Sequence, residues 1–292
     1  MSNIEKGLVR ARAGAAALRS VDSAAPTEVL PGMGAGSAEV AGVIGGTEPV
    51  IDRLAAPPAL DVQRLPGVKL DPSVLEWNRI VIDDTSGASA AYKVLRTRVL
   101  QRMRRNGWRT LGVTGTAPNE GKSLTAINLS MNLARQSGTS VVLVDMDLRK
   151  PSIHRHLGLS PKYGIGDHLR GGVPLERVAV RPGLERLGVI LNERSFSNSS
   201  EILSSPQVAQ LVDQVKQGEG RIAVFDLPPV FAGDDVLAFC PLLDAVLLVL
   251  AQGTTKRTDL VAIRELLQNV NVVGAVLNRS SEEVAPYYYG KR

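Results

Sequence analysis

The chain has 292 residues, 44% of them hydrophobic, so it is long enough and apolar enough to bury a sizeable core. Its formal net charge is +5, and much of the excess lies in residues 92–109, which hold seven Lys and Arg side chains and no acid. The single cysteine excludes an internal disulfide and indicates a reducing compartment. We find no run of about 18 apolar residues that could span a bilayer and no signal-peptide core. A cytoplasmic protein is therefore expected.

Residues 1–70 are rich in Ala, Gly, Pro and Ser and contain no aromatic residue. Such a composition buries too little apolar surface to offset chain entropy, so we predict a low-complexity, mostly disordered extension. The expected domain follows at residues 71–280, and residues 281–292 form a C-terminal tail. Trp77 and Trp108 flank the start of the domain and are interpreted as packing anchors.

Short β-branched runs alternate with amphipathic stretches beyond the extension. Strands are predicted at residues 110–114, 141–145, 187–191, 222–226, 245–250 and 272–278. Helices are predicted at residues 122–136, 201–217 and 257–270. Near-continuous apolar strands alternating with helices predict an α/β fold with a mostly parallel sheet covered on both faces. Ligands of such sheets bind beyond the carboxyl ends of the strands.

The stretch "TGTAPNEGKS" lies between a predicted strand and a predicted helix, and it ends as a Walker A motif does. Its amides and the helix N-terminus offer positive partial charge to phosphate, Lys122 can reach the β- and γ-phosphates, and the Ser123 hydroxyl can bind Mg²⁺. The strict motif would place a glycine at Thr116, whereas the glycine is Gly115. The predicted nucleotide contacts are Gly115, Thr116, Ala117, Pro118, Asn119, Glu120, Gly121, Lys122, Ser123 and Leu124.

Two further strands end in carboxylates. "VVLVDMD" ends in Asp145 and Asp147, and "IAVFDLPP" carries Asp226 before two prolines. Three carboxylates at the tips of parallel strands beside a phosphate loop can bind Mg²⁺ and orient an attacking group, so we predict a nucleotide site there. We expect Arg149 and Lys150 either to contact phosphate or a partner, or to balance the charges of Asp145 and Asp147. His154 and His156 are interpreted as surface residues.

These motifs, together with three tyrosines near the C-terminus, resemble the bacterial tyrosine kinases of capsule and exopolysaccharide biosynthesis. The resemblance runs from about residue 88 to the end of the chain. It implies a P-loop NTPase-like fold of the deviant-Walker ATPase lineage. It also implies transfer of the ATP γ-phosphoryl group to tail tyrosines, with ATP and Mg²⁺ as cofactors. The expected acceptors are Tyr287, Tyr288 and Tyr289.

The resemblance also assigns roles within the site. Lys122, Asp145, Asp147 and Asp226 would be catalytic, and Asp145 is the best candidate to position or deprotonate the tyrosine hydroxyl. Metal would be held by Ser123, Asp147 and Asp226. Asn278 stands where related ATPases place an adenine contact, but a turn-forming asparagine explains it equally well.

Partners follow from the same resemblance. We expect a separate membrane-embedded polysaccharide co-polymerase or chain-length protein that recruits the chain to the inner face of the plasma membrane. A cognate phosphotyrosine phosphatase is expected, and nucleic acid is not.

The chain departs from the resembled family in its oligomerisation helix. Ring-forming members carry E-x-x-R-x-x-R, whereas this chain has Ala90, Lys93 and Arg96 at those positions. Lysine cannot reproduce bidentate pairing, so a homo-oligomer through this helix is in doubt. The basic stretch could instead meet an acidic partner, a phosphate or an anionic membrane, or be a solvated helix face.

Two other functions compete with the kinase. The first is a positioning ATPase of the partitioning and division-site type, whose members carry an extra lysine where this chain has Ala117. The second is a non-catalytic, ATP-binding scaffold of a polysaccharide export complex. Retention of Lys122, Ser123 and the three aspartates favours retained chemistry over a scaffold.

Overall fold

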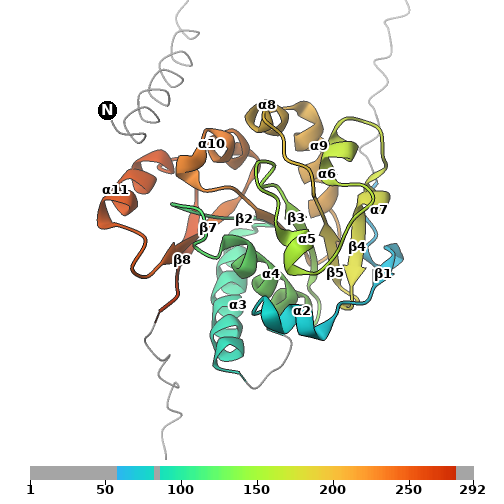
Figure 1. Cartoon of the computed structure of the whole chain (residues 1–292), viewed down its shortest axis with the longest axis horizontal. Coiled ribbons are helices and arrows are strands. Elements are labelled where there is room, and N and C mark those ends of the chain that lie inside the picture. The colour runs from blue at the N-terminus through green and yellow to red at the C-terminus, as the bar shows by residue number, and fades with distance from the viewer. Residues whose placement is uncertain (1–57, 82–85, 281–292) are drawn as a thin grey trace, which may run out of the picture. The chain divides into compact units, whose positions relative to one another are not determined.

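The computed structural model describes residues 58–81 and 86–280, which form an eight-stranded sheet of order β1-β4-β5-β3-β6-β2-β7-β8 (Figure 1). All neighbouring strands are parallel except β4 and β5. The expected mostly parallel sheet is confirmed. Its strands are β1 (Gly67–Val68), β2 (Thr110–Gly115), β3 (Ser140–Asp145), β4 (Ala179–Pro182), β5 (Leu187–Ile190), β6 (Arg221–Asp226), β7 (Ala245–Ala251) and β8 (Val272–Asn278).

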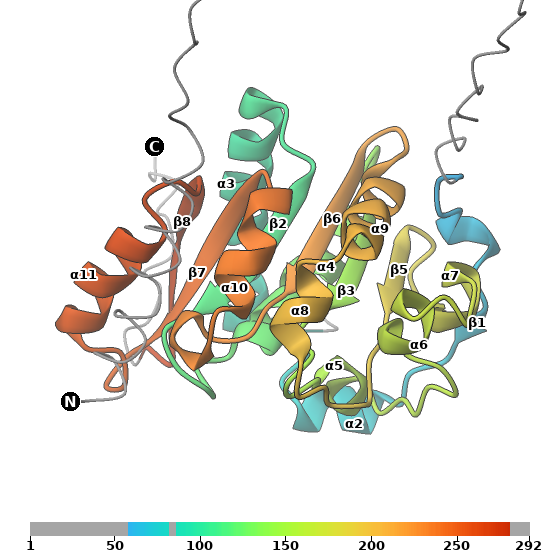
Figure 2. The same cartoon turned by 90° about the horizontal axis from the view of Figure 1, so that it is seen from above.

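Helices cover both faces of this sheet (Figure 2). One apolar cluster lies under α2 (Pro72–Trp77), α3 (Gly87–Asn106), α4 (Lys122–Ala134) and α5 (Ile153–His156). A second cluster fills the other face, under α6 (Ile165–Leu169), α7 (Leu175–Val178), α8 (Ser199–Leu203), α9 (Pro206–Lys216), α10 (Asp235–Phe239) and α11 (Arg257–Leu266). Two short 3-10 turns, η2 (Val230–Ala232) and η3 (Cys240–Leu242), flank α10. The two faces explain why β2, β3 and β6 are buried nearly throughout.

All six predicted strands are present, and the helix prediction needs one correction. The stretch expected as one helix over residues 201–217 is two helices, α8 and α9, because Pro206 begins a new helix rather than continuing the old one. The prediction also missed β1 and β4, which are only two and four residues long.

The folded domain begins earlier than the predicted residue 71. A 3-10 turn, η1 (Val62–Arg64), and its flanks bury Leu60, Val62 and Leu65 in the second cluster. Arg221 at the start of β6 donates a hydrogen bond of 3.1 Å to the Leu60 carbonyl. The apolar residues of this segment are few, but each contacts the sheet. The remainder of the predicted extension and the predicted tail, residues 1–57 and 281–292, lie outside the described residues.

The two tryptophans behave differently. Trp108 packs, half-buried, against the first cluster, as predicted. Trp77 is 87% exposed, so its interpretation as a packing anchor is wrong, and Leu75 of the same helix provides the packing instead.

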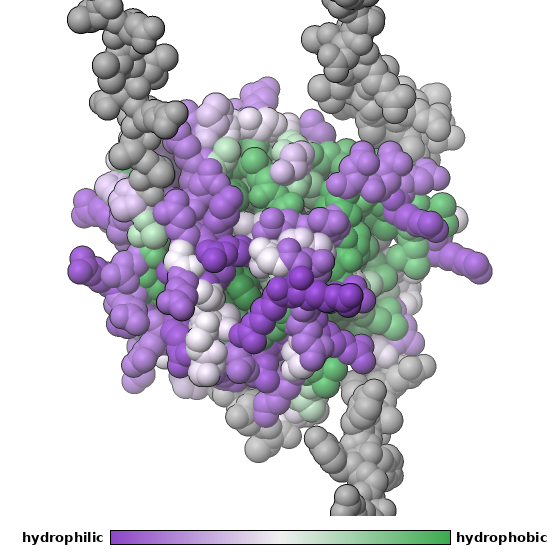
Figure 3. All heavy atoms as spheres, turned by 180° about the vertical axis from the view of Figure 1, so that it is seen from behind, coloured by the Kyte–Doolittle hydropathy of each residue, from purple (hydrophilic) through white to green (hydrophobic). Residues whose placement is uncertain are grey.

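The surface on the far side from Figure 1 carries mostly hydrophilic side chains, with apolar residues among them (Figure 3). None of the helices within residues 58–81 and 86–280 is both long enough and apolar enough to cross a membrane.

Candidate nucleotide site

The phosphate loop joins β2 to α4, and two glycines determine its course. Gly121 has φ +92°, and a Cβ on it would lie 2.1 Å from the side-chain nitrogen of Asn278. A Cβ on Gly115 would lie 2.4 Å from both a carboxylate oxygen of Glu120 and the Val249 carbonyl. Both approaches are far shorter than van der Waals contact, so neither position accepts a side chain without rearrangement. Steric exclusion of a side chain therefore explains why the displaced glycine of this loop stands at position 115.

The side chain of Glu120 folds behind the loop and holds it. It is fully buried and accepts hydrogen bonds from the backbone amides of Thr116 at 2.7 Å and Ala117 at 2.9 Å. Its other oxygen accepts from the hydroxyls of Thr116 and Thr255. This explains why Thr116 replaces the glycine of the strict motif, since its hydroxyl contributes to the same network.

Lys122, the first residue of α4, is nearly buried at 7% exposure. Its ammonium donates a hydrogen bond of 2.9 Å to the Ala117 carbonyl. Burial lowers the pKa of Lys122, while the charges of Asp226, Glu120 and Asp147 act in the opposite direction. The ammonium therefore lies among carboxylates, close to the loop that would hold phosphate.

Asp145 and Asp226 are neighbours across the paired strands β3 and β6, and both are fully buried. One oxygen of Asp145 accepts hydrogen bonds of 3.0 Å from the amides of Ser152 and Ile153. Among the described residues, its other oxygen and both oxygens of Asp226 lack a hydrogen bond of ordinary geometry, although the Ser123 hydroxyl is close enough to Asp226 to lower its pKa. Burial raises the pKa of Asp226 to about 7, and burial and the charge of Asp226 raise the pKa of Asp145 well above its usual range.

Asp147 differs from the other two aspartates because it lines the pocket. Its carboxylate accepts a hydrogen bond of 2.9 Å from the amide of Lys150, and burial raises its pKa. Of the three predicted carboxylates, Asp147 is therefore the one with direct access to a bound ligand.

The residues present fit a Mg²⁺ ion. Unpartnered buried carboxylate oxygens are costly unless a cation meets them, and hard oxygen ligands are what Mg²⁺ prefers. Ser123 adds a hydroxyl, which accepts a hydrogen bond of 2.8 Å from the Ser152 hydroxyl. Within the described ranges, no three His, Cys, Asp or Glu side chains form a ready-made metal cluster. Mg²⁺ keeps several waters and binds together with substrate phosphates, so one or two carboxylates can hold it.

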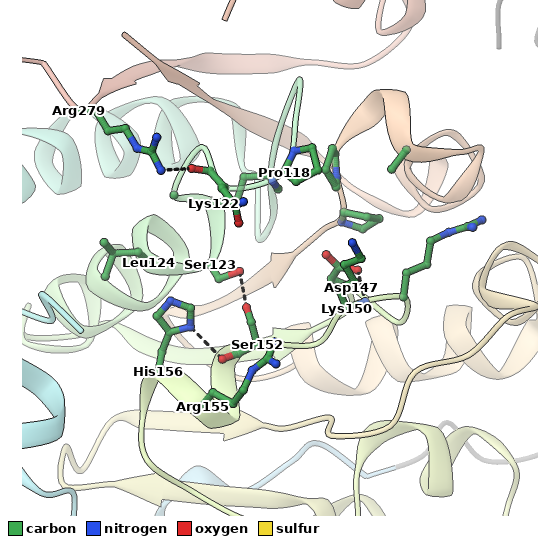
Figure 4. A pocket seen from close by; sticks show the side chains of 16 residues that line it. Pro118, Lys122, Ser123, Leu124, Asp147, Lys150, Ser152, Arg155, His156 and Arg279 are labelled. Carbon is green, nitrogen blue, oxygen red and sulfur yellow. Dashed lines mark hydrogen bonds between the residues drawn. The ribbon is translucent and has the colours of Figure 1, made fainter. Parts of the chain in front are cut away.

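A pocket of about 690 Å³ opens over these residues (Figure 4). Six of the predicted nucleotide contacts line it: Pro118, Asn119, Gly121, Lys122, Ser123 and Leu124. The five other predicted contacts do not line it and instead make contacts that hold the loop: Gly115, Thr116, Ala117, Glu120 and Asn278. The remaining lining residues are Asp147, Arg149, Lys150, Ser152, Arg155, His156, Pro228, Pro229, Ala232 and Arg279.

Arg149 is paired with an acid that the sequence analysis did not consider. Its guanidinium donates two hydrogen bonds of 2.8 Å to Asp235, which also accepts a 2.7 Å bond from the Ser199 hydroxyl. Asp235 is 2% exposed. Arg149 therefore balances Asp235, and neither Asp145 nor Asp147 is its direct partner.

The two histidines are not the surface residues that the sequence analysis predicted. His154 is buried, and burial lowers its pKa. His156 lines the pocket, and its Nδ1 lies 2.9 Å from the Ser152 carbonyl. The short helix α5 places His154 in the protein interior and His156 in the pocket wall. Their i, i+2 spacing in the sequence alone could not predict this.

The end of β8 clamps the phosphate loop. Asn278 donates a hydrogen bond of 2.8 Å to the Glu120 carbonyl, and Arg279 donates one of 2.6 Å to the Asn119 carbonyl. Both Arg279 and Asn119 have a left-handed backbone conformation, with φ of +56° and +62°. Arg279 is not among the predicted site residues. Its position directly after the last strand was the signal in the sequence that could have identified it.

Comparison with known proteins now places the chain. A family model described as ParA, NUBPL iron-transfer P-loop NTPase, matches residues 119–283. The chain belongs to this P-loop NTPase family. The match begins within the phosphate loop, at Asn119, and covers the rest of that loop, the three carboxylate positions and the clamp after β8.

Individual relatives confirm the resemblance to bacterial tyrosine kinases. The putative tyrosine-protein kinase EpsB of Ralstonia nicotianae is 32% identical over 219 residues, which is 73% of this chain but only 28% of EpsB. The tyrosine-protein kinase YwqD of Bacillus subtilis is 28% identical over 208 residues, which is 70% of this chain and 87% of YwqD. The kinase domain of Escherichia coli tyrosine kinase ETK superposes with a TM-score of 0.60 at 27% identity, covering 69% of this chain and 80% of that domain.

Proposed function

We propose that the chain is an ATP-dependent protein-tyrosine autokinase that acts in exopolysaccharide or capsule polymerisation and export. The single observation that carries the proposal is that the clamped phosphate loop and Asp147 line one pocket, with Asp145 and Asp226 buried at the adjoining ends of β3 and β6. Similarity to proteins named tyrosine kinases supports the choice of acceptor.

In the proposed reaction a tyrosine oxygen attacks the γ-phosphorus of ATP, the bond to the bridging β,γ-oxygen breaks, and ADP leaves with that oxygen. The loop amides and Lys122 neutralise the phosphate charge, and catalysis rests mainly on positioning and charge stabilisation. Mg²⁺, when bound by Ser123 and the aspartates Asp147 and Asp226, adds charge neutralisation at the phosphates.

The tyrosine proton needs an acceptor, and Asp145 remains the candidate. A phenol has a pKa near 10, so a carboxylate with a raised pKa is a better match than an ordinary one. The amides of Ser152 and Ile153 fix one oxygen of Asp145 and leave the other unpartnered among the described residues. We assign the proton to that oxygen. Because Asp145 is fully buried and does not line the pocket, the assignment requires the pocket floor to open toward Asp145 when the substrate binds.

The proposed acceptors Tyr287, Tyr288 and Tyr289 lie outside the described residues, but the structure gives their point of departure. Arg279 lies in the pocket wall, and Tyr287 follows it eight residues later. Eight extended residues span at most about 26 Å. A tail anchored at the pocket wall thus has the reach to present tyrosine to its own site or to a neighbouring copy.

A separate membrane-embedded polysaccharide co-polymerase, with a cytoplasmic segment that recruits and activates the chain, is proposed as its partner. A phosphatase that recognises phosphotyrosine would reset the modification.

The test is to incubate the purified chain with ATP and Mg²⁺, with and without the cytoplasmic segment of a candidate partner, and to map phosphotyrosine by mass spectrometry. Label on Tyr287–Tyr289 in either condition supports the proposal, and Lys122→Ala should remove it. Intact ATP hydrolysis without any phosphotyrosine would contradict the kinase and favour a positioning ATPase, which the family match makes the second candidate.

A further inference from the structure

The lining of the pocket is rich in positive charge. Five Lys and Arg side chains line it against one lining carboxylate, Asp147. Three of these cations already have a defined contact. Lys122 lies in the phosphate loop, Arg149 is paired with Asp235, and Arg279 clamps the Asn119 carbonyl.

Of the two other cations, Lys150 comes from the segment between β3 and α5, and Arg155 comes from α5 itself. Among the described residues neither has an acidic partner within salt-bridge distance. The guanidinium of Arg155 donates only to the Pro151 carbonyl, at 2.9 Å. Both side chains are exposed, so they are available to a ligand in the pocket.

Their place separates them from the phosphate loop. In Figure 4, Arg279 and Pro118 lie on one side of the pocket, while Ser152, Arg155 and His156 lie on the other, with Ser123 between them. The segment that carries Lys150 and Arg155 also supplies the amides that hold Asp145, the proposed proton acceptor. Lys150 lies beside Asp147, and Arg155 lies beside the segment that holds Asp145, so both cations are close to the proposed carboxylates (Figure 4).

We propose that Lys150 and Arg155 form an acidic-peptide subsite that selects tyrosines preceded by acidic residues. The tail itself has this chemistry, since Glu282 and Glu283 precede Tyr287 by five and four residues. Four to five extended residues span about 13–17 Å, enough to place an acid at the rim while the tyrosine reaches Asp145. The inference rests on the proposed kinase function and names the substrate class of the same site.

The test measures peptide binding independently of phosphoryl transfer. The probe is a fluorescent peptide of residues 280–291, and its partner is the full chain with Tyr287–Tyr289 changed to Phe and Glu282 and Glu283 changed to Gln. Anisotropy in the presence of ADP and Mg²⁺ gives the dissociation constant. Replacing both glutamates of the peptide by glutamine should weaken binding about fivefold, as expected for two partly exposed charge contacts.

Substitutions in the protein should remove that preference. Lys150→Gln with Arg155→Gln should bind both peptides equally weakly and leave the dissociation constant for ADP unchanged, whereas the control Arg105→Gln on α3 should keep the preference. Arg155→Glu should regain binding to a peptide with lysines in place of the two glutamates. Raising the salt concentration should diminish the difference between the peptides.

Equal binding of the acidic and neutral peptides to the parent chain would overturn the subsite. A loss of ADP affinity in the double variant as large as its loss of peptide affinity would also overturn it, by assigning the two cations to the nucleotide. Failure of the kinase proposal can be told apart from failure of the subsite. If only the kinase proposal fails, the peptides stay unphosphorylated while the preference for the acidic peptide in binding persists.

Discussion

The side-chain amide of Asn278, the last residue of β8, donates a hydrogen bond of 2.8 Å to the Glu120 carbonyl in the phosphate loop, 158 residues earlier in the chain. The same nitrogen lies where a Cβ on Gly121 would be. Asn278 therefore holds the loop beside its glycine, while its Oδ1 accepts a local hydrogen bond of 2.9 Å from the Arg279 amide, and the adenine contact stays a prediction.

Asn278→Ala should weaken binding of an ATP analogue about fivefold, because a loop that loses one hydrogen bond of about 1 kcal/mol is less well ordered for phosphate. Isothermal titration calorimetry measures the change. Asn106→Ala is the matched control, since Asn106 donates a comparable 2.8 Å bond to the Arg102 carbonyl on the exposed end of α3. Equal affinities for the two variants would contradict the role of Asn278 in the site.

Asp226→Asn should change how stability depends on pH. The folded-state pKa of Asp226 is about 7, above the ordinary value of 3.8, so the folded protein binds this proton more tightly than the unfolded chain does. Its contribution to stability is present below pH 4 and is lost as the pH rises toward 7. In EDTA, the parent chain should lose stability from pH 5 to pH 8 more steeply than the variant. Parallel pH profiles of urea unfolding would contradict the raised pKa.

Arg149→Gln should destabilise the fold by about 2 kcal/mol, because it leaves the buried Asp235 with only the Ser199 hydroxyl. The cost lies below that of a fully buried pair, since 36% of the Arg149 side chain is exposed. In an Asp235→Asn background the same substitution should cost much less. Urea denaturation of the four proteins in this cycle measures the coupling, and additive effects would contradict a direct pair.

Gly115→Ala should destabilise the protein by about 2 kcal/mol or more, because the added Cβ meets the immobile Val249 carbonyl and the buried carboxylate of Glu120. Gly87→Ala is the control, since a Cβ at Gly87 in α3 has no neighbour within 4 Å. A thermal melt of each variant decides the point. Similar melting temperatures for both would show that the loop can move to accept a side chain.

Much of this architecture was readable from the sequence. The six predicted strands are apolar runs of the kind that a buried parallel sheet requires, and Asp145, Asp147 and Asp226 lie at the predicted edge. Strand β1 escaped prediction because it has only two residues, and β4 because its four residues include an arginine and a proline, whereas the equally short β5 is wholly apolar.

The contacts around the site were harder to predict. Asp235 lies 86 residues from Arg149 in the sequence, so no local sequence pattern could predict that the two side chains pair. In the sequence, Glu120 does not differ from its neighbours in the loop. Only the fold shows that its carboxylate accepts hydrogen bonds from Thr116 and Thr255. Such roles depend on tertiary approach, which a single sequence does not reveal.

The central claim is phosphoryl transfer to the tail, and its most direct test is the phosphate content of the tryptic peptide 280–291 after incubation with ATP and Mg²⁺. We predict phosphotyrosine on this peptide in the parent chain, none in Lys122→Ala, and none when Tyr287–Tyr289 are changed to Phe. The last variant should still bind ATP. Absence of phosphotyrosine from the peptide in the parent chain, with and without the partner's cytoplasmic segment, would contradict the account.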